Sequence, residues 1–136
     1  MNNQIDQHST VLLVAEYLPF CADLRSLFCV VTGFEIVAEA RSMREGIEKA
    51  LVYRPNIILM DFYLPDGTGL DSTRVVLRDL PETKIIFMTT GEIDDDLLIA
   101  IQLGAKGYIQ KHVPDALLLA SLCALNQGVV TRYWKN

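Results

Sequence analysis

The sequence lacks most of the features that mark secreted, membrane-bound or nucleic-acid-binding chains. Its three cysteines, Cys21, Cys29 and Cys123, form no C-x-x-C pair, which favours reduced, buried thiols in the cytoplasm over a metal or redox site. The N-terminus has no apolar segment typical of a signal peptide, and no apolar run is long enough to span a membrane. Basic residues are scarce, since 12 Lys and Arg stand against 17 Asp and Glu. The net charge of −5 therefore argues against direct nucleic-acid binding by this domain, which would need clustered basic residues.

The apolar content, by contrast, is high enough for a substantial core. The chain has 136 residues, of which 51% are hydrophobic and 21% charged, and this suits one folded domain. We find no internal repeat, linker or low-complexity segment. We expect a disordered tail over 1–9, one domain over 10–128, and over 129–136 either a tail or the start of a linker.

Apolar runs and helical stripes alternate five times along this domain. The runs predict strands at 10–14, 34–40, 56–60, 84–90 and 107–110. The helical patterns lie at 19–33, between Ser42 and Pro55, and at 70–80, 94–105 and 114–128. Ser42 and Glu45 have the spacing of a capping box at the second helix. This alternation predicts an α/β fold, a doubly wound five-stranded parallel sheet with helices on both faces.

Polar residues follow the apolar runs of four of these strands. Glu16 follows the first strand, Asp61 the third, and Lys111 the fifth, while Thr89 lies at the end of the fourth. In such sheets the ligand site lies beyond the carboxyl ends of the strands, so we expect these four side chains to converge.

Phosphoryl transfer to a carboxylate is the chemistry that this set can perform. Asp61 is the candidate nucleophile. Glu16 and Asp61, together with a backbone carbonyl, offer the oxygen ligands that Mg²⁺ needs. Lys111 can neutralise one phosphoryl oxygen, and Thr89 can donate a hydrogen bond to another.

Four segments, "VLLVAE", "IILMDFYLPDGTGL", "IIFMTTG" and "LGAKGYIQK", resemble the receiver domain of bacterial two-component response regulators. The resemblance runs from Thr10 to Gly128, and "LPDGTGL" and "GYIQK" are most similar to the subfamily with a C-terminal helix-turn-helix. It implies a flavodoxin-like sheet of strand order 2-1-3-4-5 in a cytoplasmic signalling protein that is not an enzyme. It also implies a sensor histidine kinase as partner, and transcription as the output of a DNA-binding domain beyond this sequence.

The resemblance assigns a role to each residue of the set. Asp61 would accept the phosphoryl group, and Thr89 and Lys111 would hold it. Glu16, Asp61 and the backbone carbonyl of Tyr63 would bind Mg²⁺.

The resemblance also makes Tyr108 an aromatic switch that turns inward after activation.

Two positions depart from the family pattern. Ala15 stands where receivers usually have a first acid, so we expect weaker Mg²⁺ binding and less efficient phosphorylation. Lys111 is followed by His112 rather than proline, and we interpret His112 as a solvated loop residue.

The last predicted helix has an unusual surface, because no charged residue lies between Asp115 and Arg132. A helix that is apolar all round is either buried or covered by a partner. We expect a homodimer through the first and last helices, with Leu119 and Leu122 in the contact. Docking of another part of the chain, or burial within the domain, would also explain the pattern.

Three other functions can be weighed against the signalling hypothesis. A pseudo-receiver would use the same fold as an interaction module without phosphorylation, and Ala15 favours it. A haloacid-dehalogenase-type phosphatase would need an acid where Tyr63 stands. A flavodoxin-like flavin carrier would need a phosphate-cradling loop in place of "AEYLPF".

Overall fold

The protein is built around one parallel β-sheet. The computed structural model describes residues 8–30, 33–91 and 93–126. The sheet has the order β2-β1-β3-β6-β7, with all neighbours parallel. Its strands are β1 (Ser9–Val14), β2 (Phe34–Ala40), β3 (Ile57–Asp61), β6 (Lys84–Thr89) and β7 (Gly107–Gln110). Two short strands outside this sheet account for the gap in numbering, so the predicted fold class and strand order are confirmed.

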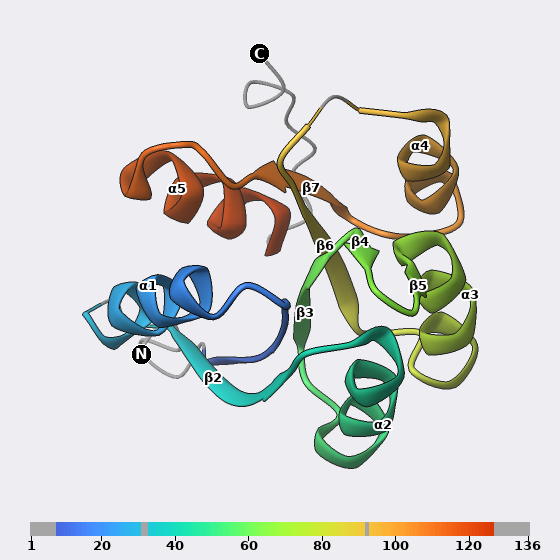
Figure 1. Ribbon diagram of the computed structural model, residues 1–136. Helices are drawn as coiled ribbons and strands as arrows, with labels where there is room; N and C mark the ends of the chain where they lie inside the picture. Colours follow the sequence, from blue (N-terminus) through green and yellow to red (C-terminus); the bar gives the residue numbers. More distant parts are fainter. Residues whose placement is uncertain (1–7, 31–32, 92, 127–136) are drawn as a thin grey trace.

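In the part of the chain that the structure describes, five helices cover the sheet in two layers (Figure 1). They are α1 (Leu18–Cys29), α2 (Met43–Tyr53), α3 (Gly69–Asp79), α4 (Asp95–Gln102) and α5 (Asp115–Asn126). α1 and α5 lie on one face, and α2, α3 and α4 lie on the other. Among the described residues, no helix is both long and apolar enough to cross a membrane.

The central strand β3 is the most deeply buried element that leads to the site. All five of its residues are buried, because α1 and α5 cover one side of the sheet and the remaining helices cover the other. Such two-sided burial explains its unbroken apolar sequence. Asp61 is the last residue of this strand rather than the first residue after it.

Most differences from the predicted elements lie at their ends. β1 begins one residue earlier than expected, at Ser9, and α1 ends at Cys29 rather than at Gly33. α4 ends at Gln102 rather than at residue 105, since Gly104 has a φ of 128°, a left-handed conformation that stops a helix. The predicted tail over 129–136 and most of the tail over 1–9 lie outside the described residues.

The start of α2 shows the predicted cap with one change. Ser42 Oγ accepts a hydrogen bond from the Glu45 backbone N–H at 3.1 Å, as a capping box requires. The Glu45 carboxylate, however, accepts from the backbone N–H of Arg41 at 2.7 Å, one residue before the cap.

A short hairpin follows β3, within a segment for which the sequence predicted neither a strand nor a helix. Its antiparallel strands are β4 (Tyr63–Leu64) and β5 (Gly67–Thr68). Asp66 at its tip accepts hydrogen bonds from the backbone N–H groups of Met43 and Arg44, at 2.8 and 2.9 Å. The hairpin is therefore fastened to the first turn of α2.

Two expectations about burial were wrong. Cys21 is buried, but Cys29 and Cys123 are exposed free thiols. Leu122 is 0% exposed and belongs to the core, so it does not form the expected contact, whereas Leu119 is half-buried and its part in a contact stays a prediction. The surface of α5 is therefore made by smaller side chains than the sequence suggested.

Candidate functional site

The carboxyl ends of the strands form one cavity of about 200 Å³. The cavity is lined by the four side chains expected at this edge and by the residues around them, namely Glu16, Tyr17, Asp61, Phe62, Tyr63, Met88, Thr89, Thr90 and Lys111. Residues from β1 to the segment after β7 thus meet at one place, because parallel strands all end at the same edge.

Asp61 lies between two neighbours at the centre of this edge. Its residue is only 6% exposed. Oδ2 accepts a hydrogen bond from the backbone N–H of Glu16 at 3.3 Å. Oδ1 lies 2.6 Å from Lys111 Nζ as an ion pair, yet no described residue donates to it with hydrogen-bond geometry. Lys111 is therefore the partner of this buried oxygen, through charge rather than through an aligned hydrogen bond.

Lys111 reaches Asp61 from the loop that follows β7. Its backbone N–H donates to the Thr89 carbonyl at 2.9 Å, which extends the β6–β7 pairing by one step. Its side chain is 13% exposed, and its ammonium lies 4.7 Å from the centre of the Phe20 ring.

Thr89 supplies an unused hydroxyl. It is the last residue of β6 and is 8% exposed. Its Oγ1 is buried and has no hydrogen-bond partner among the described residues. Since an unsatisfied buried hydroxyl costs free energy, this atom is suited to an acceptor that enters the cavity.

Glu16 and Tyr63 lie at the rim of the cavity and are both exposed. The phenolic O–H of Tyr63 donates to Asp94, whose other oxygen caps α4 through the Leu97 backbone N–H at 3.0 Å. The described residues contain no group of three or more His, Cys, Asp or Glu that could hold a metal ion. Two carboxylates and a nearby backbone carbonyl fit a Mg²⁺ ion that keeps several of its waters.

Ala15 occupies the corner where a third carboxylate would complete the acidic set. It is 0% exposed, and its carbonyl accepts a weak hydrogen bond from the thiol of Cys21 at 3.7 Å. Burial raises the pKa of that thiol above its usual value, so Cys21 is a neutral packing residue here. The corner therefore offers a methyl group and a bonded carbonyl in place of a carboxylate.

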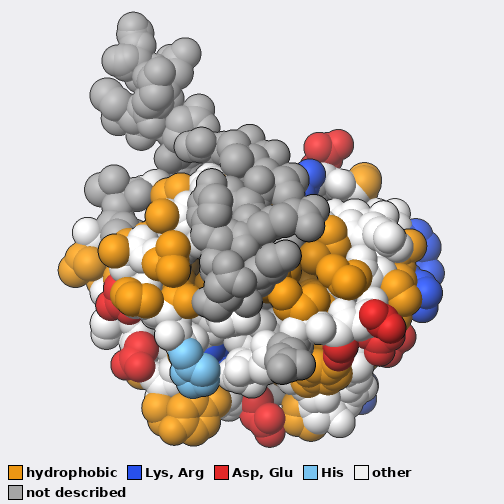
Figure 2. Space-filling view, turned by 90° about the horizontal axis from the view of Figure 1, so that it is seen from above, with side chains coloured by type: hydrophobic (Ala, Val, Ile, Leu, Met, Phe, Trp, Pro, Cys, Tyr) orange, Lys and Arg blue, Asp and Glu red, His pale blue; other side chains and the backbone are white. Residues whose placement is uncertain are grey.

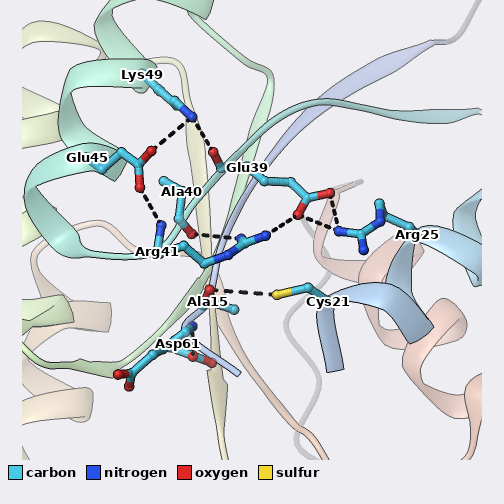
Figure 3. A network of polar contacts seen from close by, with 10 residues as sticks. Ala15, Cys21, Arg25, Glu39, Ala40, Arg41, Glu45, Lys49 and Asp61 are labelled. Atoms are coloured by element: carbon cyan, nitrogen blue, oxygen red, sulfur yellow. Dashed lines mark hydrogen bonds and ion pairs between the residues drawn. The ribbon is translucent and has the colours of Figure 1, made fainter. Parts of the chain in front are cut away.

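A polar network lies above this corner and holds α1 and the start of α2 to the edge strand β2 (Figure 3). Glu39 receives Arg25 on both oxygens, at 2.6 and 2.7 Å, and Arg41 at 2.9 Å. Partial burial by itself would raise the pKa of Glu39, but the two guanidinium groups outweigh it and hold the pKa below its usual range. One carboxylate balances only one of the two guanidinium charges, so this cluster keeps a net positive charge beside the site.

Tyr108 lies in β7 and is only 7% exposed. Tyr108 is therefore already buried in this structure, and its role as a switch stays a prediction. His112 is exposed, as expected for a solvated loop residue.

Three contacts around the site were missed by sequence reasoning: the ring of Phe20 against Lys111, the bond from Tyr63 to Asp94, and the cap that Asp66 forms on α2. The sequence placed Phe20 within the helical pattern over 19–33, which is a correct local description. No local signal identifies the partners in the three contacts.

A parallel sheet of this order, with a carboxylate at the end of its central strand paired to a lysine, defines the class of receiver domains. Residues 11–122 match the family model of the response regulator receiver domain. The chain belongs to this family, whose members are signalling domains rather than enzymes and generally bind Mg²⁺ at the phosphorylation site.

Known relatives agree with this assignment. The oxygen regulatory protein NreC of Staphylococcus aureus is 37% identical over 112 residues, which are 79% of this chain and 52% of that protein. The chain thus spans about half the length of the curated relatives it matches. A LuxR-family response regulator from Aurantimonas has a TM-score of 0.84 at 26% identity, covering 92% of this chain and 89% of that one. The isolated receiver domain of RcsB from Salmonella enterica shares the fold, with a TM-score of 0.83 at 17% identity. The match covers 94% of this chain and 96% of that one.

Response regulators of this kind work with sensor histidine kinases and often dimerise.

Proposed function

We propose that Asp61 accepts a phosphoryl group from the phosphohistidine of a sensor kinase. A carboxylate oxygen attacks phosphorus, the bond from phosphorus to the imidazole nitrogen breaks with its electron pair, and an acyl phosphate forms. The observation that carries the proposal is the setting of Asp61, which is buried at the cavity with its Oδ1 2.6 Å from the Lys111 ammonium.

Two further groups serve the transferred phosphoryl group. Lys111 balances the charge that the acyl phosphate adds, since a phosphoryl group carries close to two negative charges at neutral pH. Thr89 donates its unused hydroxyl to a phosphoryl oxygen, and this satisfies a buried polar atom at the same time.

Glu16, Asp61 and the backbone carbonyl of Tyr63 hold Mg²⁺ in this proposal. The ion supplies positive charge for the oxygens of the transferring group. Ala15 leaves the set with two carboxylates, and we therefore expect a higher Mg²⁺ requirement than a set of three would have.

Incubation with acetyl phosphate and Mg²⁺, followed by intact mass measurement, tests the proposal. The wild-type chain should gain one phosphoryl group, and Asp61→Asn should gain none. Asp71→Asn, an exposed acid in the first turn of α3, is the matched control and should react like the wild type. A wild-type chain that gains no mass at saturating Mg²⁺ would refute the proposal and favour the phosphorylation-independent module.

The output of this receiver is transcription, through a helix-turn-helix domain of the same polypeptide. Support comes from the length of NreC, of which the matched region covers 52%, and from the likeness to a LuxR-family regulator. The full-length gene product checks this point, because the sequence after Asn136 must encode such a domain.

A homodimer through α1 and α5 is the assembly that we favour. The two helices lie on the same face of the sheet (Figure 1), and hydrophobic side chains are exposed on the α5 side of the molecule as well as on the α4 side (Figure 2). Both helices expose small, uncharged side chains: Ala22, Ser26 and Cys29 in α1, and Ala116, Ala120 and Cys123 in α5, beside the exposed charged residues Asp23, Arg25 and Asp115. Small side chains allow two helices to approach closely across a twofold axis.

Sedimentation in the presence of reductant tests this assembly. Ala120→Glu should weaken the dimer, because it places a charge on the exposed face without touching the core. Leu98→Glu on α4, where Leu98 is 48% exposed, is the control and should leave the dimer intact. If Leu98→Glu weakens the dimer and Ala120→Glu does not, the interface lies on α4 instead. Leu122 is unsuitable for this purpose, since a charge there would disrupt the core.

A further inference from the structure

Lys111 needs a precise position although little holds its side chain. A lysine carries four rotatable bonds, and ordering them costs conformational entropy. The loop after Lys111 runs through the exposed His112, and the backbone of Lys111 is tied to β6 by one hydrogen bond. Restraint of the ammonium must therefore come from what surrounds its end.

One surrounding group is the carboxylate of Asp61, at 2.6 Å from Nζ. Its attraction depends on the negative charge of Asp61. When an oxygen of Asp61 forms a bond to phosphorus, the carboxylate becomes an acyl phosphate, and the charge moves onto the phosphoryl oxygens. The ammonium must therefore change partners during the reaction, from Asp61 to a phosphoryl oxygen, and Asp61 alone does not keep it at the cavity during this exchange.

The second surrounding group is the ring of Phe20, over which Nζ lies at 4.7 Å from the centre. An aromatic face attracts a cation through its quadrupole at distances up to about 6 Å. This attraction does not change when Asp61 reacts. Phe20 is itself held in place, because it lies in the first turns of α1 and packs against the core.

We propose that Phe20 is a positioning residue for phosphoryl transfer, which holds the Lys111 ammonium at the cavity before and after Asp61 reacts. The proposal rests on the proposed function of Asp61. A residue that only fills space in the core would be replaced well by leucine, whereas a residue that acts through its π face would not.

Two variants and a matched control separate these roles. Phe20→Leu keeps an apolar side chain but removes the aromatic face, and Phe20→Tyr keeps the face. Phe28→Leu makes the same change in the same helix at a ring that is 6% exposed and stacks on Phe34. Urea unfolding of each variant measures the loss of packing.

Rates of phosphorylation by acetyl phosphate are then compared at saturating Mg²⁺. We expect Phe20→Leu to react about two- to fivefold more slowly than the wild type, which is the rate equivalent of one cation–π contact. Phe20→Tyr should react at the wild-type rate, and Phe28→Leu should do so despite its lower stability. Equal rates for Phe20→Leu and the wild type would overturn the inference.

Nuclear magnetic resonance of the lysine side chains gives a readout that does not depend on phosphorylation. In the wild type the ring current of Phe20 should shift the Lys111 Hε signals upfield, and Phe20→Leu should abolish this shift while Phe28→Leu preserves it. A wild-type chain that is not phosphorylated would refute the function of Asp61, and the Lys111 signals would then decide the inference alone. Identical Lys111 signals in the wild type and Phe20→Leu would overturn it.

Discussion

Asp66 fastens the hairpin after β3 to α2, and removing its carboxylate should destabilise the fold by a measurable amount. Its two oxygens accept the backbone N–H groups of Met43 and Arg44, which are two of the donors that a helix start leaves without intrahelical partners. Ser42 serves the third donor, that of Glu45. The carboxylate is negatively charged at the positive end of the helix dipole, which adds to the effect.

The size of the loss follows from these contacts. Replacing a capping side chain by alanine costs about 0.5–2 kcal/mol. Because Asp66 forms two bonds but is exposed to water that can replace them, we expect about 1.5 kcal/mol for Asp66→Ala and about half of that for Asp66→Asn. With a urea m-value of about 1.5–2 kcal/mol per molar, the unfolding midpoint of Asp66→Ala should fall by about 0.8–1 M.

The pH dependence supplies a second check. The backbone N–H groups of Arg44 and Met43 hold the pKa of Asp66 below its usual range. A carboxyl group whose pKa is lower in the folded state stabilises the fold above its unfolded pKa, near about 4, and this contribution is lost as the pH falls through the folded value. The difference in the free energy of unfolding between the wild type and Asp66→Ala should thus be constant above about pH 5 and shrink on further acidification.

Asp71→Ala is the matched control for this prediction. Asp71 is an exposed acid in the first turn of α3, so it shares the dipole environment but accepts no hydrogen bond from another described residue. A midpoint for Asp66→Ala no lower than that of Asp71→Ala would refute the reasoning. So would a difference that stays constant down to about pH 3.

Three further changes have defined outcomes. Gly69→Ala should lower the free energy of unfolding by about 1–3 kcal/mol in urea titration, because its Cβ would lie 2.3 Å from a Phe87 ring carbon and 2.6 Å from one of Phe62. Arg54→Gly should raise that free energy by about 0.5 kcal/mol, since Arg54 has a φ of 45° and the strain of such a residue exceeds the added chain entropy of glycine. Ala15→Asp should lower the Mg²⁺ concentration for half-maximal phosphorylation by about tenfold, and an unchanged requirement would show that this corner does not reach the ion.

Much of the fold was predictable because it depends on local patterns. The strand Phe34–Ala40 was predicted with its observed ends, and the order of elements along the chain is confirmed. The meeting of Glu16, Asp61, Thr89 and Lys111 at one edge was also predictable, since parallel strands joined by helices must end on the same side. The roles of these residues stay predictions until phosphorylation is measured.

The last helix shows where local patterns stop being informative. α5 is apolar almost all round, so its sequence contains no stripe that marks the buried face. Only docking against the sheet decided that Leu122 enters the core while Ala120 faces outward. The predicted surface was therefore wrong for Leu122, although the helix itself was predicted over 114–128 and is found at Asp115–Asn126.

The sequence by itself determined the elements, their alternation and the edge at which the polar side chains collect, because these depend on periodicity and chain connectivity. Tertiary structure alone decided which side chains touch. Phe20 reaches Lys111, Asp66 caps α2, and Tyr63 bonds Asp94 only because packing angles bring distant segments within a few ångströms. Such distances depend on how whole helices and loops settle on the sheet, and a linear pattern of residue types does not contain that information.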